Sequence, residues 1–229
     1  MSGQQPWKFR RLLLALLALL AIQPAAEGHD LARVAYTTLW SLVLIATIIA
    51  IYEIRWQRYV GLCLALPVVV GLWGRYLLSA PAGKTVELAI FGLATVFFAV
   101  VAVMVMRRLV TREVTTDNVA GAVCAYLFLG LGTGLLFTII ETQHPHSFES
   151  SGRLAADLAD PSRRAATLTY FSFVTLATVG YGDIEPATPL TRILAVLEAV
   201  LGQFYLAVFV AGLVGIRVSR HREGGPNNG

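Results

Sequence analysis

Residues 178–183 read Thr-Val-Gly-Tyr-Gly-Asp, between a short apolar segment and a long one. The short segment runs from about Ala166 to Ala177, and the long one begins near Pro189. About a dozen apolar residues are too few to cross the ~30 Å hydrocarbon core of a bilayer, so the short segment is interpreted as a re-entrant half-helix. Irregular backbone at membrane depth is tolerated only where it lines a water-filled cavity or is buried in protein. Residues 178–183 are therefore predicted to line a pore.

The composition is that of a membrane protein. Of the 229 residues, 56% are hydrophobic and 14% are charged, whereas soluble domains carry about 25% charged residues. The formal net charge of +4 comes mostly from basic residues beside the ends of apolar runs. Membrane topology explains that placement better than nucleic-acid binding does, so no nucleic-acid partner is expected.

Six apolar segments predict six transmembrane helices, at about residues 9–22, 34–52, 59–78, 86–106, 119–140 and 190–216. Each is too long and continuous to be a membrane strand, so an all-α membrane protein is expected, with the half-helix between helices five and six. The first segment also fits a cleavable signal peptide, because basic residues, a Leu-rich stretch and Pro24-Ala25-Ala26 follow one another. A retained helix is favoured.

The chain is divided into a four-helix membrane domain with its linker (1–117), a pore domain (118–217) and a disordered cytoplasmic tail (218–229). Basic residues cluster at four places that share one side if every helix spans: before helix one and after helices two, four and six. Both termini are therefore predicted to be cytoplasmic, and the protein is predicted to lie in the cell (inner) membrane. The loop between helices five and six departs from this pattern, with basic and acidic residues that offset one another: Glu141, Glu149, Arg153, Asp157, Asp160, Arg163 and Arg164.

The run at 178–183 has the residues that a dehydrated cation needs. Backbone carbonyls can replace the water shell of an ion. Aiming successive carbonyls at one axis requires alternating positive and negative φ, which Gly180 and Gly182 permit. Val179 and Tyr181 are then expected to point away from the axis and wedge against the half-helix, while the Thr178 hydroxyl adds an oxygen at the cytoplasmic end. The carbonyl end of the half-helix also favours a cation at the pore centre.

Residues 175–183, Thr-Leu-Ala-Thr-Val-Gly-Tyr-Gly-Asp, resemble the pore loop of the potassium channel superfamily. The match runs from about Tyr170 to Gly215, and the fifth helix matches by position only. The resemblance implies passive, selective K⁺ flow through a tetramer, with K⁺ held by four residues of each chain: Thr178, Val179, Gly180 and Tyr181. One filter strand cannot surround an ion, so four copies must assemble in the bilayer with cyclic symmetry. No cofactor is expected apart from K⁺ as the permeant ion.

Five further residues are expected to support the filter. Thr175, Gly182 and Asp183 flank the ion-holding residues. In the family, paired aromatic residues on the half-helix form a cuff behind the filter, and Tyr170 and Phe171 occupy the matching places. Tyr170 is expected either to hydrogen-bond Asp183 or to be a simple interfacial tyrosine.

Other residues are candidates outside the filter. Gly202 matches the family's hinge glycine, with helix packing as the alternative. Glu198, one turn earlier, is a candidate functional intramembrane acid. Glu185 predicts a ring of four carboxylates that concentrates cations at the outer mouth. His144 and His146 are either pH-sensitive groups or, as favoured, solvated loop residues.

The fourth segment carries no gating charges: Glu87, at its outer end, is its one charged residue. We therefore expect no strong intrinsic voltage gating, and a separate regulatory partner stays open. No nucleotide loop, nucleophile–base pair or metal-ligand cluster is found in the sequence, so an enzyme is not expected. The alternative function is a non-conducting regulatory or sensor subunit that retains the channel fold.

Overall fold

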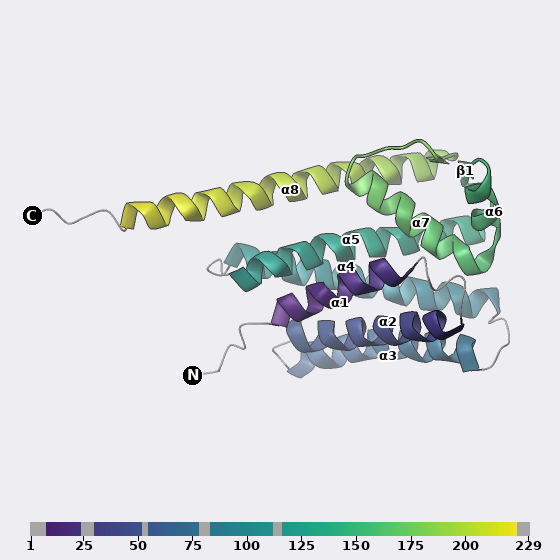
Figure 1. Ribbon diagram of the computed structural model, residues 1–229, viewed down its shortest axis with the longest axis horizontal. Coiled ribbons are helices and arrows are strands. Elements are labelled where there is room, and N and C mark those ends of the chain that lie inside the picture. The colour runs from purple at the N-terminus through teal and green to yellow at the C-terminus, as the bar shows by residue number, and fades with distance from the viewer. Residues whose placement is uncertain (1–7, 24–29, 52–54, 78–82, 112–115, 224–229) are drawn as a thin grey trace, which may run out of the picture.

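The structure, a computed structural model, describes residues 8–23, 30–51, 55–77, 83–111 and 116–223. The described chain is mostly helical (Figure 1). Five long helices come first: α1 (Lys8–Ile22), α2 (Asp30–Ile51), α3 (Arg55–Leu77), α4 (Lys84–Thr111) and α5 (Thr116–Gln143). They are followed by β1 (Phe148–Ser150), α6 (Arg153–Ala159), α7 (Pro161–Leu176), β2 (Ile184–Pro186) and α8 (Pro189–Glu223).

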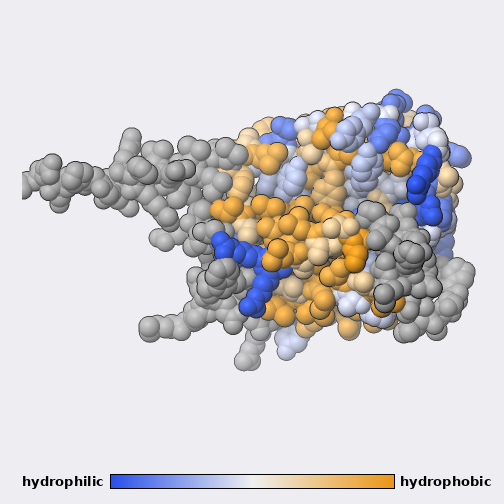
Figure 2. Space-filling view, in the orientation of Figure 1, coloured by the Kyte–Doolittle hydropathy of each residue, from blue (hydrophilic) through white to orange (hydrophobic). Residues whose placement is uncertain are grey.

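Within the described residues, three helices are long and apolar enough to cross a membrane, and the chain is a membrane protein. The spans are Lys84–Arg107 in α4, Val119–Gln143 in α5 and Pro189–Phe209 in α8. Helices α2 and α3 contain shorter apolar stretches, Val34–Ile49 and Tyr59–Gly74. Figure 2 shows a hydrophobic middle on this face of the molecule, with hydrophilic residues toward its two ends.

The first helix is part of the main hydrophobic core. Leu12, Leu16 and Leu19 are at most 1% exposed, and their spacing places them on one face of α1. That face packs against α2 and α5. The carboxylate of Asp117, at the start of α5, accepts hydrogen bonds from the backbone N–H groups of Phe9 (3.5 Å) and Arg10 (3.3 Å). These N–H groups lie in the first turn of α1, where no carbonyl of the helix can accept them.

Helix α4 joins the N-terminal helices to the rest of the molecule. Its contact with α5 is the most extensive between any two elements described. Phe98 of α4 lies between Trp40 of α2 and Phe128 of α5, with ring centroids 5.6 Å and 5.4 Å away. The α4–α5 packing is therefore apolar and includes aromatic contacts from three helices.

The segment that links α5 to α8 starts and ends at the same end of the molecule. In Figure 1, α7 runs obliquely from α6 toward the middle of α8, and the chain then returns to β2 beside β1. α7 contacts both α5 and α8. This is the re-entrant course expected of the half-helix.

Three details of this region differ from the sequence predictions. The described chain is mostly helical, as expected, but two three-residue strands, β1 and β2, form an antiparallel pair in the register Phe148↔Pro186, Glu149↔Glu185, Ser150↔Ile184. The half-helix begins at Pro161 rather than near Ala166, since Asp160 and Pro161 form a helix start that the apolar pattern does not reveal.

The third error concerns the tail. α8 continues to Glu223, so residues 218–223 are helical and not disordered. Gly224-Gly225-Pro226 follows directly, and two glycines before a proline oppose continuation of a helix. Residues 224–229 lie outside the described residues.

Candidate functional site

Asp160 starts the half-helix α7. Its side chain accepts hydrogen bonds from the backbone N–H of Ser162 (2.9 Å) and from the Ser162 hydroxyl (2.8 Å). Pro161 occupies the first helical turn, where its missing N–H costs nothing. The backbone and hydroxyl bonds from Ser162 lower the pKa of Asp160, so the cap is charged at neutral pH.

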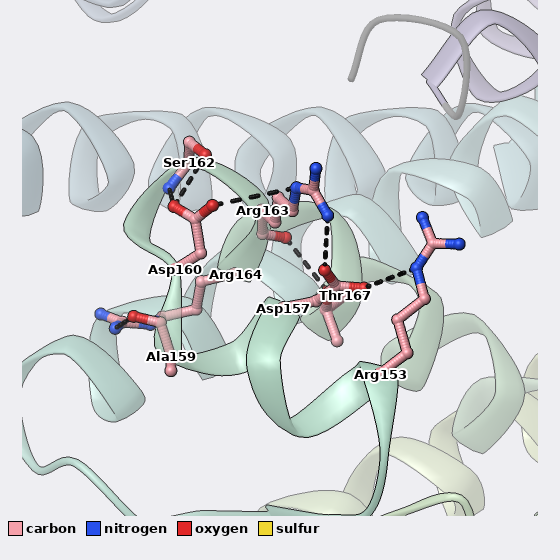
Figure 3. Close-up of polar contacts among 8 residues, drawn as sticks. All are labelled: Arg153, Asp157, Ala159, Asp160, Ser162, Arg163, Arg164 and Thr167. Carbon is pink, nitrogen blue, oxygen red and sulfur yellow. Dashed lines mark hydrogen bonds and ion pairs between the residues drawn. The ribbon is translucent and has the colours of Figure 1, made fainter. Parts of the chain in front are cut away.

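The charged residues of the loop before α7 are bonded to one another (Figure 3). Arg163 Nη1 lies 2.9 Å from Asp157 Oδ1, and Arg153 Nε lies 3.9 Å from Asp157 Oδ2. Arg164 donates to the carbonyls of Leu158 (2.8 Å) and Ala159 (3.1 Å). Two of the basic residues that depart from the orientation pattern, Arg163 and Arg164, therefore hold α6 against α7, whereas Arg153 pairs within α6.

The predicted filter, residues 178–183, begins as a turn directly on the end of α7. The N–H of Thr178 donates to the Thr175 carbonyl at 2.9 Å, and the N–H of Val179 donates to the Val174 carbonyl at 2.9 Å. Thr175 thus holds Thr178 through its backbone carbonyl, while its role in filter support stays a prediction. Because two carbonyls of the last turn hold the first two filter residues, the position of α7 determines where the filter starts.

The backbone of the filter alternates in sign of φ. Gly180 has φ 60° and Gly182 has φ 72°, as the sequence predicts. Thr178 also has a positive φ, 54°, so every second residue from 178 to 182 is left-handed. The threonine was not predicted to do this, because nothing in a β-branched residue suggests a left-handed backbone.

Tyr170 bonds the far end of the filter. Its hydroxyl donates to Asp183 Oδ2 at 2.6 Å, which is the hydrogen bond considered from the sequence. This bond, followed by burial, raises the pKa of Tyr170 to about 12, so the hydroxyl remains a donor at neutral pH. Phe171, next to it, packs elsewhere, with ring centroids 5.4 Å from Phe137 and 5.2 Å from Phe148.

Two side chains of residues 178–183 are exposed within one chain. Val179 is 51% exposed and Tyr181 is 69% exposed. Their wedging against a half-helix stays a prediction, because the neighbouring chains that could cover them are not part of the structure.

Helix α8 touches α7 and the filter at successive positions. A Cβ on Gly202 would overlap the carbonyl oxygen of Leu176, the last residue of α7, so close packing requires this glycine. Gln203 Nε2 donates to the Thr178 hydroxyl at 2.9 Å, a contact that the sequence did not suggest. α8 is continuous through Gly202, and the hinge stays a prediction.

Glu198 lies behind the filter and is 2% exposed. Its Oε1 accepts hydrogen bonds from Ser172 of α7 (2.5 Å) and from Thr133 of α5. Its Oε2 is buried without a hydrogen-bond partner among the described residues. Ser172 and Thr133 were not identified from the sequence, since single hydroxyl residues in apolar helices are common.

The β1–β2 pair, where the sequence predicts the outer mouth, carries a second carboxylate beside Glu185. The strand register places Glu149 directly opposite Glu185, and both are exposed. Glu141 is different: it is 6% exposed, and its carboxylate accepts three backbone N–H bonds of 2.9–3.0 Å from residues 146–148. His144 and His146 are exposed in this loop.

Comparison with known proteins shows what parts of this chain are similar to. Residues 160–217 match a family described as an ion channel. The two-pore potassium channel c of Oryza sativa subsp. japonica is 36% identical over 70 residues, which are 31% of this chain and 14% of that protein. The two-pore potassium channel 5 of Arabidopsis thaliana is 47% identical over 45 residues, 20% of this chain and 11% of that protein. No solved structure matches the chain.

Part of this chain therefore matches an ion channel family and is similar to two potassium channels, and the chain spans only a small part of the length of those relatives. The family match begins at Asp160, the cap of α7, and ends at Arg217 in α8. The match to the ion channel family thus covers α7, residues 178–183 and α8 as far as Arg217. Helices α1 to α5 lie outside that family match.

Proposed function

We propose that this protein is a K⁺-selective channel subunit that conducts K⁺ passively through a tetrameric pore. The observation that carries the proposal is the alternating backbone at Thr178, Gly180 and Gly182 at the carbonyl end of a re-entrant helix. Such alternation turns successive carbonyls toward one side, where they can replace the water shell of a cation. The ligands of K⁺ are then the carbonyls of residues 178–181 and the Thr178 hydroxyl.

The apolar surface of α8 supports assembly of several copies. Only 22% of its apolar window is buried within one chain, against 56% for α5. A large set of its apolar side chains is at least 40% exposed: Leu190, Ile193, Val196, Leu197, Val200, Leu201, Phe204, Leu206 and Val208. Val179 and Tyr181 of the filter are exposed on the same chain. Four copies around one axis would cover the filter side chains and part of α8, while lipid would cover the remainder.

We also infer six membrane segments, with both termini on the cytoplasmic side of the cell membrane. The first turn of α1 and the last turns of α8 lie toward the same end of the molecule, opposite α6 (Figure 1). α1 has 15 residues, or about 22 Å, and would reach across only with local thinning of the bilayer. Its buried leucines favour retention of this segment over its removal as a signal peptide.

The four-helix domain is proposed to support the pore without sensing voltage. In α4, residues 88–106 contain no charged residue, and each gating charge would contribute ~2.3 kcal/mol per 100 mV. Phe97, Phe98 and Val101 of this helix are fully buried in apolar packing. A packed helix with no charge between residues 88 and 106 supplies no steep voltage dependence, so opening is assigned to another stimulus or to a separate partner.

Reconstitution of the purified protein alone tests the proposal. Liposomes loaded with K⁺ should take up tracer K⁺. Ba²⁺ should block this uptake, and no uptake should occur when Na⁺ replaces the internal K⁺. Native mass spectrometry should give four times the chain mass of 24.8 kDa. Folded tetramers without K⁺ flux or K⁺ binding would instead support a non-conducting regulatory or sensor subunit.

A further inference from the structure

The buried carboxyl of Glu198 joins three helices behind the filter. Oε1 of Glu198 lies in hydrogen-bond contact with the hydroxyls of Ser172 in α7 and Thr133 in α5, which are themselves 2.7 Å apart. Ser172 is fully buried, and its hydroxyl also lies 2.7 Å from the Gly130 carbonyl of α5. The three oxygens therefore form one closed cluster that ties α8 to both of the helices beside it.

Glu198 lies on the face of α8 that touches the half-helix and the filter. Gly202 is four residues later and packs on the Leu176 carbonyl, and Gln203 follows with its bond to Thr178. Residues four apart lie above one another on a helix. The Glu198 cluster is therefore the outermost of three successive attachments between α8 and the α7–filter segment.

The cluster acts through hydrogen bonds rather than through a charge. No ion pair with Glu198 occurs among the residues that the structure describes, and Oε2 has no hydrogen-bond partner among them. A buried carboxylate without a cation would be strongly destabilising in a membrane. A neutral acceptor at Oε1 is sufficient for the contacts with Ser172 and Thr133.

We propose that Glu198 is a positioning residue for the ion filter: it fixes α7 between α5 and α8, and α7 fixes the first two filter residues. The mechanical link is short, because Ser172 lies one turn before Thr175, whose carbonyl holds the Thr178 N–H. A shift of α7 would move the first K⁺ ligands. This role rests on the proposed function, since it concerns K⁺ binding at residues 178–181.

K⁺-dependent thermal stability of the purified tetramer tests the role without requiring an open pore. The wild type should unfold at a higher temperature in K⁺ than in Na⁺, since an ion bound to the folded state stabilises it. In Glu198→Met, which keeps the length but removes the acceptor, the K⁺ concentration for half of this shift should rise about tenfold. Glu198→Gln should keep the wild-type value, because its amide oxygen replaces Oε1.

Threonine substitutions in α5 provide the matched control. The hydroxyls of Thr133 and Thr138 each lie 2.8 Å from the carbonyl four residues earlier, but of the two only Thr133 also contacts Ser172 and Glu198. Thr133→Val should weaken the K⁺ effect as Glu198→Met does, and Thr138→Val should not. The Glu198→Met/Thr133→Val double variant should lose less stability than the two single losses together.

Two results would overturn the proposal while leaving K⁺ binding intact: a wild-type K⁺ effect in Glu198→Met, or additive losses in the double variant. Loss of the K⁺ effect in Glu198→Gln would show that charge is required and would overturn the hydrogen-bonding role. A wild type that does not distinguish K⁺ from Na⁺ would contradict the proposed function and, with it, the positioning of K⁺ ligands. The double-variant cycle would still decide whether the cluster joins the helices.

Discussion

The α5–α8 region and helices α1–α4 are held together in different ways. In α5–α8, polar side chains cross between elements: Tyr126 donates to the Leu176 carbonyl at 3.2 Å, and Tyr205 donates to the Ala122 carbonyl at 2.5 Å. In α2 and α4, several hydroxyls donate to carbonyls four residues earlier in their own helices, at Thr38, Ser41, Thr47 and Thr95. The contacts between helices α1–α4 are mainly apolar, although Trp73 Nε1 of α3 donates to the Ser41 hydroxyl of α2 at 3.0 Å.

This difference has consequences for how each region tolerates change. Apolar burial is non-directional and depends mainly on the area removed from water. Hydrogen bonds between elements require particular distances and angles. Small changes in α5–α8 should therefore weaken ion binding, whereas similar changes in α1–α4 should have little effect on ion binding.

The largest contrast is expected between two Gly→Ala substitutions. Gly180→Ala should abolish K⁺ uptake, because alanine at φ 60° costs about 1–2 kcal/mol in each subunit and turns the ion-facing carbonyls away. Gly92→Ala in α4 should leave uptake intact and stabilise the protein by about 0.5–1 kcal/mol, because nothing lies within 4 Å of the new Cβ. Liposome flux and thermal unfolding measure both. Uptake retained by Gly180→Ala would contradict the filter assignment.

The next largest effect concerns Gly202. Gly202→Ala should destabilise the protein by about 1–3 kcal/mol, because its Cβ would collide with the backbone carbonyl of Leu176. The melting temperature of the purified protein gives the result, again with Gly92→Ala as the control. A stability gain equal to that control would mean that α8 does not pack on the end of α7.

A smaller effect is expected at Tyr170. Tyr170→Phe keeps the ring and removes the 2.6 Å bond to Asp183, which should cost about 1 kcal/mol at this partly exposed position. Tyr59→Phe, at a tyrosine that is 68% exposed in α3, should change stability by less than about 0.5 kcal/mol. Chemical unfolding in K⁺ compares the two. Equal, negligible losses would remove Tyr170 from the filter support.

The smallest effect is expected at the outer mouth. The Glu149→Gln/Glu185→Gln variant should lower K⁺ conductance about twofold at low salt, because the paired carboxylates no longer concentrate cations. At 1 M salt, where the screening length is about 3 Å, the difference from wild type should vanish. Single-channel recordings across this range measure it. A loss that persists at high salt would indicate a change of structure instead.

The sequence predicts those features that depend on residue type at fixed spacing. The positive φ of Gly180 and Gly182 followed from glycine itself, and the re-entrant course followed from the length of an apolar segment. Partnerships across the fold could not be predicted in this way. Ser172 bonds Glu198, and Glu149 lies opposite Glu185, only because the fold brings together the elements that carry them.

The left-handed backbone of Thr178 was also beyond reach, because it arises from the turn at the end of α7 rather than from the threonine. The end of α8 shows the opposite error. The Gly-Gly-Pro-Asn-Asn-Gly end of the sequence suggested a disordered tail from residue 218, although arginine and glutamate are good helix formers and the helix continues to Glu223.

The most direct test of the central claim is the reversal potential of the purified protein in a planar bilayer with K⁺ on one side and Na⁺ on the other. If the carbonyls of residues 178–181 form the filter, the reversal potential should lie far from zero. Its sign should be the one at which the voltage opposes the flow of K⁺ down its concentration gradient. The Glu198→Gln variant should share that value. A reversal potential near zero would mean that the pore does not distinguish the two ions, and would contradict the account.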